Sequence, residues 1–365
     1  MNILLVITGL GLGGAEKQVC LLADQFAARG HKVGIVSLTN KTDVKPSNPE
    51  VELFILDMKK NVLGFIGTIK RLRVIANNFN PDVIHGHMFH ANIMVRFLNA
   101  LTTRKNKIIS TAHNKYEGGA LRKCLYRLTD PFNHITTNVS QEALDKFIAD
   151  KVFLKKKSFT VYNGIDTNYF KFNNNARSYL RQSLNVSEQD ILLLAVGRLT
   201  EAKDYPNLIK AFKKTPSNYK LIIIGEGDAE AAILKIIENN NLSLRIKLLG
   251  VKNNVRDYYS ASDIFVLSSA WEGFGLVVAE AMSCERIVIA TDSGGVKEVI
   301  GNPEFLVPIK NPDALAKKII DISKLNSSYK EIICKKNRSF IVDNFSIDNT
   351  ISKWLHIYKS LNSTI

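Results

Sequence analysis

The chain has 365 residues, of which 45% are hydrophobic and 23% charged. This length suits two domains with separate cores, and the composition excludes a disordered or fibrous protein. The formal net charge of +15 is uneven, since residues 1–165 carry 23 Lys and Arg against 12 Asp and Glu. A basic first half suits an anionic partner such as a phospholipid headgroup, a lipid diphosphate or nucleic acid, or else serves solubility alone.

Strand-like apolar runs alternate with amphipathic helical stretches from the first residues onward. In the first half, the predicted helices span 14–29 and 62–79, between strands at ILLVIT, KVGIVSL, VELFIL, DVIHGH and KIISTAH. After Gly164 the pattern restarts, with helices near 205–214, 228–240 and 253–260 and from about 275, between strands at ILLLAVG, KLIIIG, RIKLLG, DIFVLSS and RIVIAT. This alternation predicts the α/β class, with two Rossmann-like doubly wound parallel sheets.

A segment rich in Asn and turn formers, KKKSFTVYNGIDTNYFKFNNNARS, marks the junction between the two sheets. We therefore expect one domain over residues 1–165 and a second over 166–345. The last stretch has helical spacing over 346–362. We expect residues 346–365 to form a helix that crosses back to the first domain.

Glycines follow the first predicted strand. Gly9, Gly11 and Gly14 spell G-x-G-x-x-G before a helix, where backbone amides and a helix N-terminus bind a pyrophosphate. A dinucleotide site also needs an acid at the end of the second strand, and residues 37–40 are SLTN, which disfavours a dehydrogenase. Two interpretations remain: Gly13 and Gly14 let a donor diphosphate or an acceptor approach the backbone, or the turn is purely structural.

Two cations, Arg198 and Lys203, follow the predicted strand ILLLAVG. Ligands of open α/β sheets bind beyond the carboxyl ends of the strands, so this pair is a candidate for neutralising a leaving diphosphate. The alternative is a pair of solvated loop cations.

Two carboxylates lie in the segment 270–284, AWEGFGLVVAEAMSC. Glu272 lies in a glycine-broken loop, and Glu280 lies eight residues later on an apolar helix. Carboxylates suit the vicinal hydroxyls of a sugar or ribose, and free amides at a helix start suit a phosphate. Glu280 within VVAEAM needs a bonded partner, because an isolated buried acid is costly. The alternative for Glu280 is a structural role on the helix face beside a cation.

The segment EGFGLVVAE resembles the E-x7-E motif of glycosyltransferase family 4, whose members have the two-domain GT-B fold. Six further matches stand in order along nearly the whole chain: Gly13-Gly14-Ala15-Glu16, His113 in STAHN, VYNGID over 161–166, Arg198 and Lys203 in GRL…K, IIIGEGD over 222–228, and TDSGGVKEVI over 291–300. Single strings of this kind are weak signals. Seven matches in the order found in the family are together a specific signal.

The resemblance implies a nucleotide-sugar bound between the domains, mainly on the second. Glu280 would hold the ribose hydroxyls, and Glu272 would contact the donor hexose. Arg198 and Lys203 would stabilise the charge on the departing diphosphate. Backbone amides would reach the sugar hydroxyls and the β-phosphate from Gly273, Phe274, Gly275 and Leu276.

Two further positions complete the site that the resemblance implies. His113 would face the donor sugar from the first domain, with a strand-end structural role as the alternative, and Val251 would line the base pocket. The chain contains no Asp-x-Asp, hence no obvious carboxylate clamp for a divalent ion, and neither a metal nor a cofactor is expected. The family implies retention of anomeric configuration, with the leaving phosphate oxygen taking the acceptor's proton.

The acceptor side is suggested by apolar residues with basic neighbours. Near one predicted helical face stand Val62, Phe65, Ile66, Ile69, Leu72 and Phe79, with Lys70, Arg71 and Arg73 close by. A second cationic segment contains Lys115, Arg122, Lys123 and Arg127, interleaved with Leu121, Leu125, Tyr126 and Leu128. Such stripes suit peripheral docking on anionic lipid, and equally a helix packed on its own sheet.

The function expected is transfer of a hexose or N-acetylhexosamine, from UDP by preference and GDP as the alternative. The resemblance implies a lipid-linked glycan acceptor in bacterial O-antigen, capsule or exopolysaccharide synthesis at the inner face of the cytoplasmic membrane. A non-hydrolysing UDP-sugar 2-epimerase and a non-catalytic sugar-nucleotide-binding protein are the alternatives. Nucleic-acid binding is disfavoured, since no recognisable module or stacking aromatics accompany the basic residues.

Two observations support a cytoplasmic protein. No run of 18 apolar residues occurs, and the apolar start lacks a basic segment, which predicts a strand and not a signal peptide. The four cysteines, Cys20, Cys124, Cys284 and Cys334, form no C-x-x-C pair, which argues against a disulfide framework or a zinc site. We expect reduced, mostly buried thiols.

Overall fold

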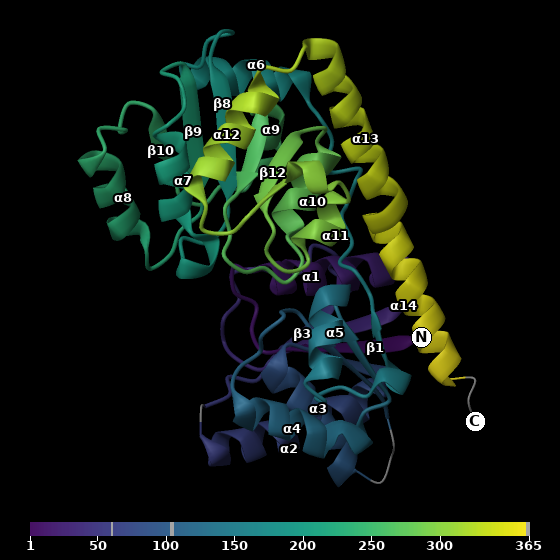
Figure 1. Ribbon diagram of the computed structural model, residues 1–365. Helices are drawn as coiled ribbons and strands as arrows, with labels where there is room; N and C mark the ends of the chain where they lie inside the picture. The colour runs from purple at the N-terminus through teal and green to yellow at the C-terminus, as the bar shows by residue number, and fades with distance from the viewer. Residues whose placement is uncertain (60, 103–105, 363–365) are drawn as a thin grey trace. The chain divides into compact units, whose positions relative to one another are not determined.

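The structure is a computed structural model that describes residues 1–59, 61–102 and 106–362 (Figure 1). The chain divides into two compact units. The first comprises Met1–Gly164 and Ile347–Ile365, and the second comprises Ile165–Ser346. Each unit is built on its own parallel β-sheet, so the predicted α/β class with two doubly wound sheets is confirmed.

The first sheet has seven strands in the order β3-β2-β1-β4-β5-β6-β7, and every neighbouring pair is parallel. The strands are β1 (Asn2–Ile7), β2 (Lys32–Ser37), β3 (Glu52–Ile55), β4 (Val83–His87), β5 (Lys107–Ala112), β6 (Ile135–Asn138) and β7 (Ser158–Thr160). The register sets Ile7, His87 and Thr111 side by side where β1, β4 and β5 end. The strand order reverses between β1 and β4, which is where open α/β sheets form a ligand crevice.

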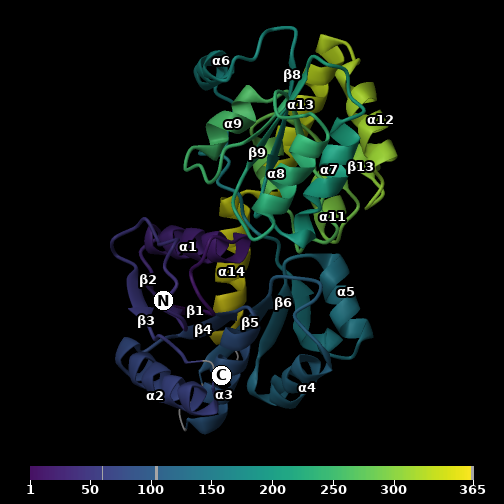
Figure 2. The same cartoon turned by 90° about the vertical axis from the view of Figure 1, so that its left-hand side faces the viewer.

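Helices cover both faces of the first sheet (Figure 2). They are α1 (Gly14–Ala27), α2 (Val62–Phe79), α3 (Phe89–Leu101), α4 (Ala120–Thr129), α5 (Gln141–Ala149) and the C-terminal α14 (Ile347–Asn362). Alternate residues of β1 point to opposite faces: Ile3 and Leu5 pack with α1 and α14, whereas Leu4 packs with α2 and α3. Trp354 and Tyr358 anchor α14 in the first core.

The second sheet has six parallel strands in the order β10-β9-β8-β11-β12-β13. The strands are β8 (Ile191–Val196), β9 (Tyr219–Ile224), β10 (Ile246–Leu248), β11 (Ile264–Leu267), β12 (Ile287–Thr291) and β13 (Leu306–Val307). The helices are α6 (Asn174–Ser183), α7 (Tyr205–Phe212), α8 (Glu230–Asn239), α9 (Val255–Ala261), α10 (Leu276–Ser283), α11 (Val296–Ile300), α12 (Pro312–Ser323) and α13 (Ser327–Phe345). Here the order reverses between β8 and β11, whose carboxyl ends therefore neighbour each other.

The predicted helix over 62–79 is confirmed as α2, but its apolar residues do not form one buried stripe. Ile69, Leu72 and Phe79 are in the core, whereas Val62 is 75% exposed and Ile66 is 46% exposed. The period of apolar residues defines one face of α2. The core covers this face toward the end of the helix but not at its start. The prediction of mostly buried thiols is confirmed for only two of the four cysteines, because Cys20 and Cys284 are buried, Cys334 is partly buried and Cys124 on α4 is exposed.

Within the described part of the chain, no helix combines the length and apolar character needed to cross a bilayer.

Candidate functional site

Three loops at the carboxyl edge of the second sheet carry the residues that the sequence singled out there. Arg198 and Lys203 follow β8, Glu272 follows β11, and Gly294 follows β12. Because β8, β11 and β12 are consecutive in the sheet, their following loops are neighbours in space although they are far apart in sequence.

The structure brings Lys203 and Glu272 together in an ion pair. The Ser269 hydroxyl donates to the same Glu272 oxygen at 2.7 Å. The Lys203 and Glu272 side chains are only 17% and 14% exposed. Backbone contacts fix the two loops on each other, since the Ala270 amide donates to the Ala202 carbonyl at 2.8 Å. A partly buried cation held in this way is positioned before any ligand arrives.

Arg198 differs from Lys203 in its surroundings. Its side chain is exposed, and among the described residues it has no hydrogen-bond or ion-pair partner. Val251, after β10, is 44% exposed. Neither side chain is fixed in the way that Lys203 is.

The loop before α10 is shaped by glycine. Gly275 caps the helix with φ 89°, a left-handed conformation that a side chain disfavours. Phe274 is buried and packs edge-on against Phe345 at 5.5 Å between ring centroids. The amides of Val278 and Ala279 donate to the Gly275 carbonyl, so the Leu276 and Val277 amides precede the first helical bonds of α10. With Gly273 they form a row of backbone donors suited to an anionic or hydroxyl-rich ligand.

Glu280 on α10 has a tyrosine partner that sequence reasoning missed. The Tyr259 hydroxyl, from α9, donates to Glu280 Oε2 at 2.7 Å. Burial and the nearby carboxylate raise the pKa of Tyr259 well above its usual value, so the hydroxyl stays protonated and continues to donate. Nothing in the sequence DYYSASD marks Tyr259 as a partner, because the contact arises only when α9 packs beside α10.

Gly294 meets the backbone of the Glu272 loop. It has φ 65°, and a Cβ there would lie 2.1 Å from the Glu272 carbonyl oxygen. Gly250 in the same unit has φ 64° but open space around the Cβ position. The two glycines share a conformation, and Gly294 alone has a steric conflict.

Gly294→Ala is expected to lower the thermal unfolding midpoint well below that of Gly250→Ala. Both substitutions force alanine into a left-handed conformation, which costs about 1–2 kcal/mol. Only Gly294→Ala must also displace the Glu272 loop. Calorimetry on both variants checks this expectation, and equal midpoints would show that the close approach has no energetic consequence.

The first unit contributes His113, directly after β5. The side chain is 7% exposed, and burial lowers its pKa to about 4, so the imidazole is neutral near pH 7. The ring atom Nε2 lies 3.1 Å from Nδ1 of His87, and the backbone amide donates to Glu117 Oε1 at 3.2 Å. Gly13 and Gly14 lie at the start of α1, where a Cβ on Gly13 would come 2.3 Å from Glu16 Oε2. Both features lie beyond carboxyl ends of strands in the first sheet.

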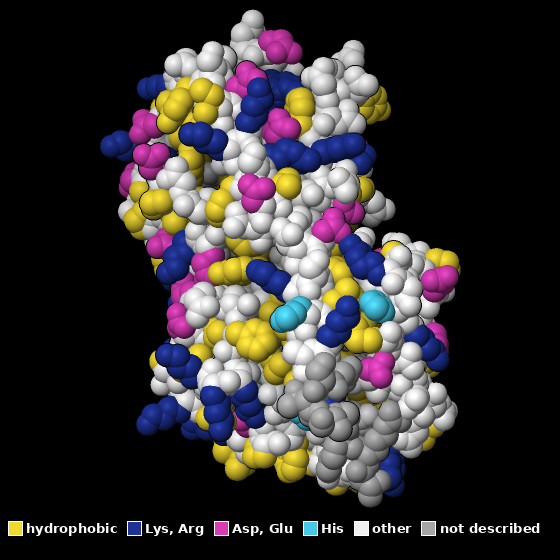
Figure 3. All heavy atoms as spheres, turned by 90° about the vertical axis from the view of Figure 1, so that its right-hand side faces the viewer, with side chains coloured by type: hydrophobic (Ala, Val, Ile, Leu, Met, Phe, Trp, Pro, Cys, Tyr) yellow, Lys and Arg dark blue, Asp and Glu magenta, His cyan; other side chains and the backbone are white. Residues whose placement is uncertain are grey.

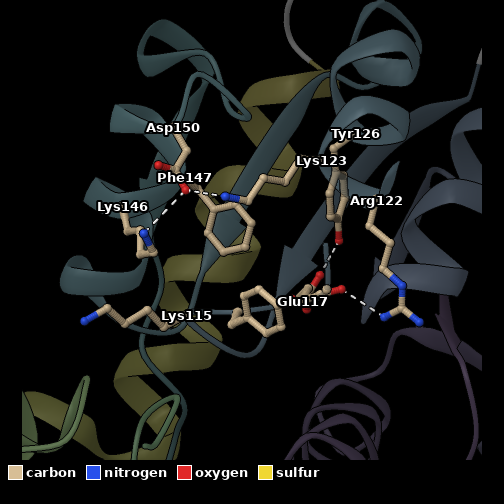
Figure 4. Close-up of a pocket in the computed structure, with 10 residues that line it drawn as sticks. Lys115, Glu117, Arg122, Lys123, Tyr126, Lys146, Phe147 and Asp150 are labelled. Carbon is tan, nitrogen blue, oxygen red and sulfur yellow. Dashed lines mark hydrogen bonds and ion pairs between the residues drawn. The ribbon is translucent and has the colours of Figure 1, made fainter. Parts of the chain in front are cut away.

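A small pocket next to His113 was not predicted (Figure 4). Glu117 lies in it, accepting from the Tyr126 hydroxyl, while Arg122 donates to the Glu117 backbone carbonyl at 2.9 Å. Lys123 and Lys146 both point to Asp150. The cations of this lining are therefore held by carboxylates or a carbonyl, as Figure 4 shows for these residues.

The pKa of Glu117 gives a pH-dependent stability. Burial raises this pKa from an ordinary 4.5 to about 7, while hydrogen bonds and Arg122 and Arg96 oppose the rise. Between these two pKa values, the folded state thus keeps a proton on Glu117 that the unfolded state releases. The resulting stabilisation is full below the unfolded pKa and is lost as pH rises through the folded pKa.

Glu117→Gln is expected to be more stable relative to the native chain at pH 8 than at pH 5. Glutamine keeps the shape of the side chain and cannot ionise. Unfolding midpoints of both proteins across this range check the sign. A difference that does not change with pH would contradict a raised pKa.

Comparisons with known proteins agree with this arrangement. A family model described as "Glycosyltransferase Family 4" matches residues 12–169, and one described as "Glycosyl transferases group 1" matches residues 177–339. The solved structure of Anabaena HepE in complex with UDP superposes with a TM-score of 0.84 at 21% identity, covering 99% of this chain and 100% of that chain. The fold and the site define a GT-B glycosyltransferase.

Two curated relatives cover nearly the whole chain. "N-acetyl-alpha-D-glucosaminyl L-malate synthase" of Bacillus anthracis is 24% identical over 96% of this chain and 94% of its own. The "N-acetylgalactosamine-N,N'-diacetylbacillosaminyl-diphospho-undecaprenol 4-alpha-N-acetylgalactosaminyltransferase" of Campylobacter jejuni is 26% identical over 96% of this chain and 98% of its own. With the two family models in tandem, the chain belongs to glycosyltransferase family 4.

Proposed function

We propose that the chain is a retaining, metal-independent glycosyltransferase that moves a hexose or N-acetylhexosamine from a nucleotide diphosphate to a lipid-linked glycan. The observation that carries the proposal is the cluster of Lys203, Glu272 and Ser269 at the carboxyl edge of the second sheet. It supplies a positioned cation and a carboxylate beside the glycine-rich loop and the N-terminal turn of α10. These are the groups that a sugar diphosphate requires.

The proposed roles follow the chemistry of each group. Glu280 holds the ribose hydroxyls, with its carboxylate oriented by Tyr259. Glu272 and the amides from Gly273 to Leu276 bind the sugar hydroxyls and the β-phosphate. Lys203 stabilises the charge that develops on the leaving diphosphate, and Arg198 closes over it from its exposed loop.

Two further residues have proposed contacts with the nucleobase and with the reacting sugar. Val251 borders the base, and His113 faces the donor sugar as a neutral imidazole. The acceptor attacks the face that the diphosphate leaves, and a leaving phosphate oxygen takes its proton. This route retains configuration and needs no dedicated carboxylate base.

UDP is the nucleotide we propose, with GDP as the alternative. The HepE structure contains UDP, and the Campylobacter relative is named for a diphospho-undecaprenol acceptor. We propose a lipid-linked acceptor in assembly of a bacterial surface polysaccharide, used at the inner face of the cytoplasmic membrane; the name of that relative and the basic first unit support the lipid-linked acceptor.

The membrane surface we propose lies on α2 and α4. Leu63 and Val62 at the start of α2 are 81% and 75% exposed, and Leu121 and Leu128 on α4 are 75% and 68% exposed. Exposed basic side chains accompany them at Lys59, Lys70, Arg71, Arg73 and Arg127. Basic and hydrophobic side chains also gather at the lower end of the face drawn in Figure 3, over the first unit. Exposed leucines among cations suit the interface of an anionic bilayer.

Leu63→Asp is expected to weaken binding to phosphatidylglycerol vesicles by about 10-fold or more, since burying a leucine contributes about 1.5–3 kcal/mol. The matched control is Leu244→Asp, because Leu244 on the second unit is 93% exposed. Vesicle sedimentation measures both variants. Equal losses, or none, would contradict docking through α2.

The function itself is tested by calorimetric titration with UDP, GDP and their sugars in the presence of EDTA, followed by a hydrolysis assay. The expected result is tight binding of one nucleotide diphosphate and slow release of one sugar. A folded protein that binds none of them would overturn the proposal. Binding with interconversion of epimers instead of release would favour an epimerase.

A further inference from the structure

The loop that carries the two cations of the second unit is tied together at its base by a tyrosine. Tyr205, the first residue of α7, is 2% exposed, and its hydroxyl donates to the Gly197 carbonyl at 2.9 Å. Burial and the nearby Glu272 carboxylate raise the pKa of Tyr205, so the hydroxyl stays protonated and continues to donate. The bond joins the residue that precedes Arg198 to the helix that follows Lys203.

A strained turn precedes Tyr205. Asp204 has φ 45°, a left-handed conformation that non-glycine residues rarely adopt. Its carboxylate caps α7 by accepting from the Asn207 amide at 3.3 Å. Strain of this kind persists only where the surrounding contacts fix it. The cap holds the turn from which the Tyr205 side chain extends to Gly197.

The Gly197 carbonyl occupies a space that a second glycine leaves open. A Cβ on Gly225, in the loop after β9, would lie 2.0 Å from this carbonyl oxygen. The Gly197 amide donates to the Ile224 carbonyl at 3.0 Å, and the described part of the chain offers the Gly197 carbonyl no donor besides Tyr205. Tyr205 therefore selects the direction of this carbonyl.

The direction of the Gly197 carbonyl decides where Arg198 begins. A peptide unit is planar, so its carbonyl and the following amide turn together. Glycine permits several backbone conformations, so the unit between Gly197 and Arg198 can rotate unless a contact selects one orientation. On the far side of Arg198, the Leu199 amide donates to the Glu226 carbonyl at 2.8 Å. The backbone of Arg198 is thus fixed on both sides, although its side chain is exposed.

The two cations of this loop are held in different ways. Lys203 is fixed through its side chain by Glu272, whereas contacts of the backbone alone place Arg198 among the described residues. We propose that Tyr205 is a positioning residue, whose hydroxyl fixes the peptide between Gly197 and Arg198 and thereby the point from which the Arg198 guanidinium reaches the leaving diphosphate. The inference rests on the proposed function for the role of Arg198. All of these residues belong to the second unit.

NMR can observe the peptide between Gly197 and Arg198 alone, because no other glycine in the sequence is followed by arginine. When the full-length chain is isotope-labelled at glycine carbonyl carbons and arginine nitrogens, a correlation through the peptide bond gives a single cross peak. In Tyr205→Phe the ring remains and the donor is lost, so the carbonyl carbon resonance is expected to move upfield. An unchanged cross peak in folded Tyr205→Phe would overturn the proposal.

Tyr219→Phe is the matched control. Tyr219 is 4% exposed, its hydroxyl bonds the Ser323 hydroxyl, and it lies at the start of β9, the opposite end of that strand from Gly225. This variant is expected to leave both the cross peak and donor hydrolysis unchanged. A cross peak that moves equally in both variants would show a general loosening of the second unit and would contradict a specific contact.

Activity shows whether the contact acts through Arg198. Tyr205→Phe is expected to lower donor hydrolysis about 3- to 10-fold, the effect of losing one neutral hydrogen bond, with the dissociation constant of UDP little changed. In an Arg198→Ala background the same substitution is expected to lower hydrolysis by no more than about twofold, because the positioned side chain is already absent. In a Glu272→Gln background the full loss should remain. A full loss in the Arg198→Ala background would contradict the positioning role.

The two readouts separate this inference from the proposed function. If the cross peak responds as expected but the native chain hydrolyses no nucleotide-sugar, the proposed function fails while the positioning of the Arg198 backbone stands. If hydrolysis occurs and Tyr205→Phe changes neither the cross peak nor the rate, the positioning role fails alone.

Discussion

Lys203→Ala is expected to lower kcat by about 100- to 1,000-fold, the loss that follows removal of one preorganised group from a site of developing charge. The dissociation constant of the nucleotide diphosphate should change much less, because Lys203 acts mainly on charge that appears as the bond breaks. Steady-state kinetics together with calorimetry of UDP separate the two effects.

The ion pair with Glu272 supplies an alternative explanation for that loss. Removing Lys203 leaves a partly buried carboxylate with Ser269 as its remaining contact in this cluster. If Lys203 only neutralised Glu272, the double variant Lys203→Ala with Glu272→Gln would recover activity, whereas a direct role on the diphosphate predicts no recovery. Lys210→Ala is the control, since Lys210 is an exposed lysine on α7. Near-native turnover in Lys203→Ala would refute the assignment.

Glu280→Ala is expected to raise the dissociation constant of UDP by about 10- to 100-fold, since hydrogen bonds to a charged group contribute about 1.5–3 kcal/mol. Turnover at saturating donor should fall little, because the ribose is remote from the bond that breaks. Calorimetric titration with UDP measures the first effect, and kinetics at saturation measure the second.

Tyr259→Phe is the informative companion of Glu280→Ala. It removes the hydroxyl that orients the carboxylate and keeps the ring packed between α9 and α10. We expect a weaker effect on UDP binding than that of Glu280→Ala, in the same direction. A dissociation constant within twofold of the native value in folded Glu280→Ala would exclude the ribose role.

The fold class and many of its elements could be predicted because parallel strands and amphipathic helices leave strong periods in the sequence. The helices α3, α5, α6 and α12 were not among the predicted elements. Helix α13 was not predicted either, since only Ile333, Ile341 and Phe345 of its residues are buried and its remaining apolar residues do not repeat on one buried face. The helical period of apolar residues also could not predict that Val62 and Leu63 are exposed. A helical period shows which face is apolar, and tertiary packing decides which turns of that face are covered.

The candidate site could be predicted where its residues are close in sequence. Glu272 and Glu280 lie in one segment, and the resemblance of that segment to the E-x7-E motif singles them out. The pairing of Lys203 with Glu272 joins residues 69 positions apart, and it depends on β8 and β11 being neighbours in the sheet. Partners supplied by other helices, such as Tyr259 for Glu280, leave no local signal.

The most direct test of the central claim is proton NMR of the reaction with UDP-sugars in EDTA, recorded before the released or transferred sugar equilibrates between anomers. The account predicts turnover without added metal and a first product with the same anomeric configuration as the donor. Inversion of configuration, or turnover that requires a divalent ion, would contradict the account.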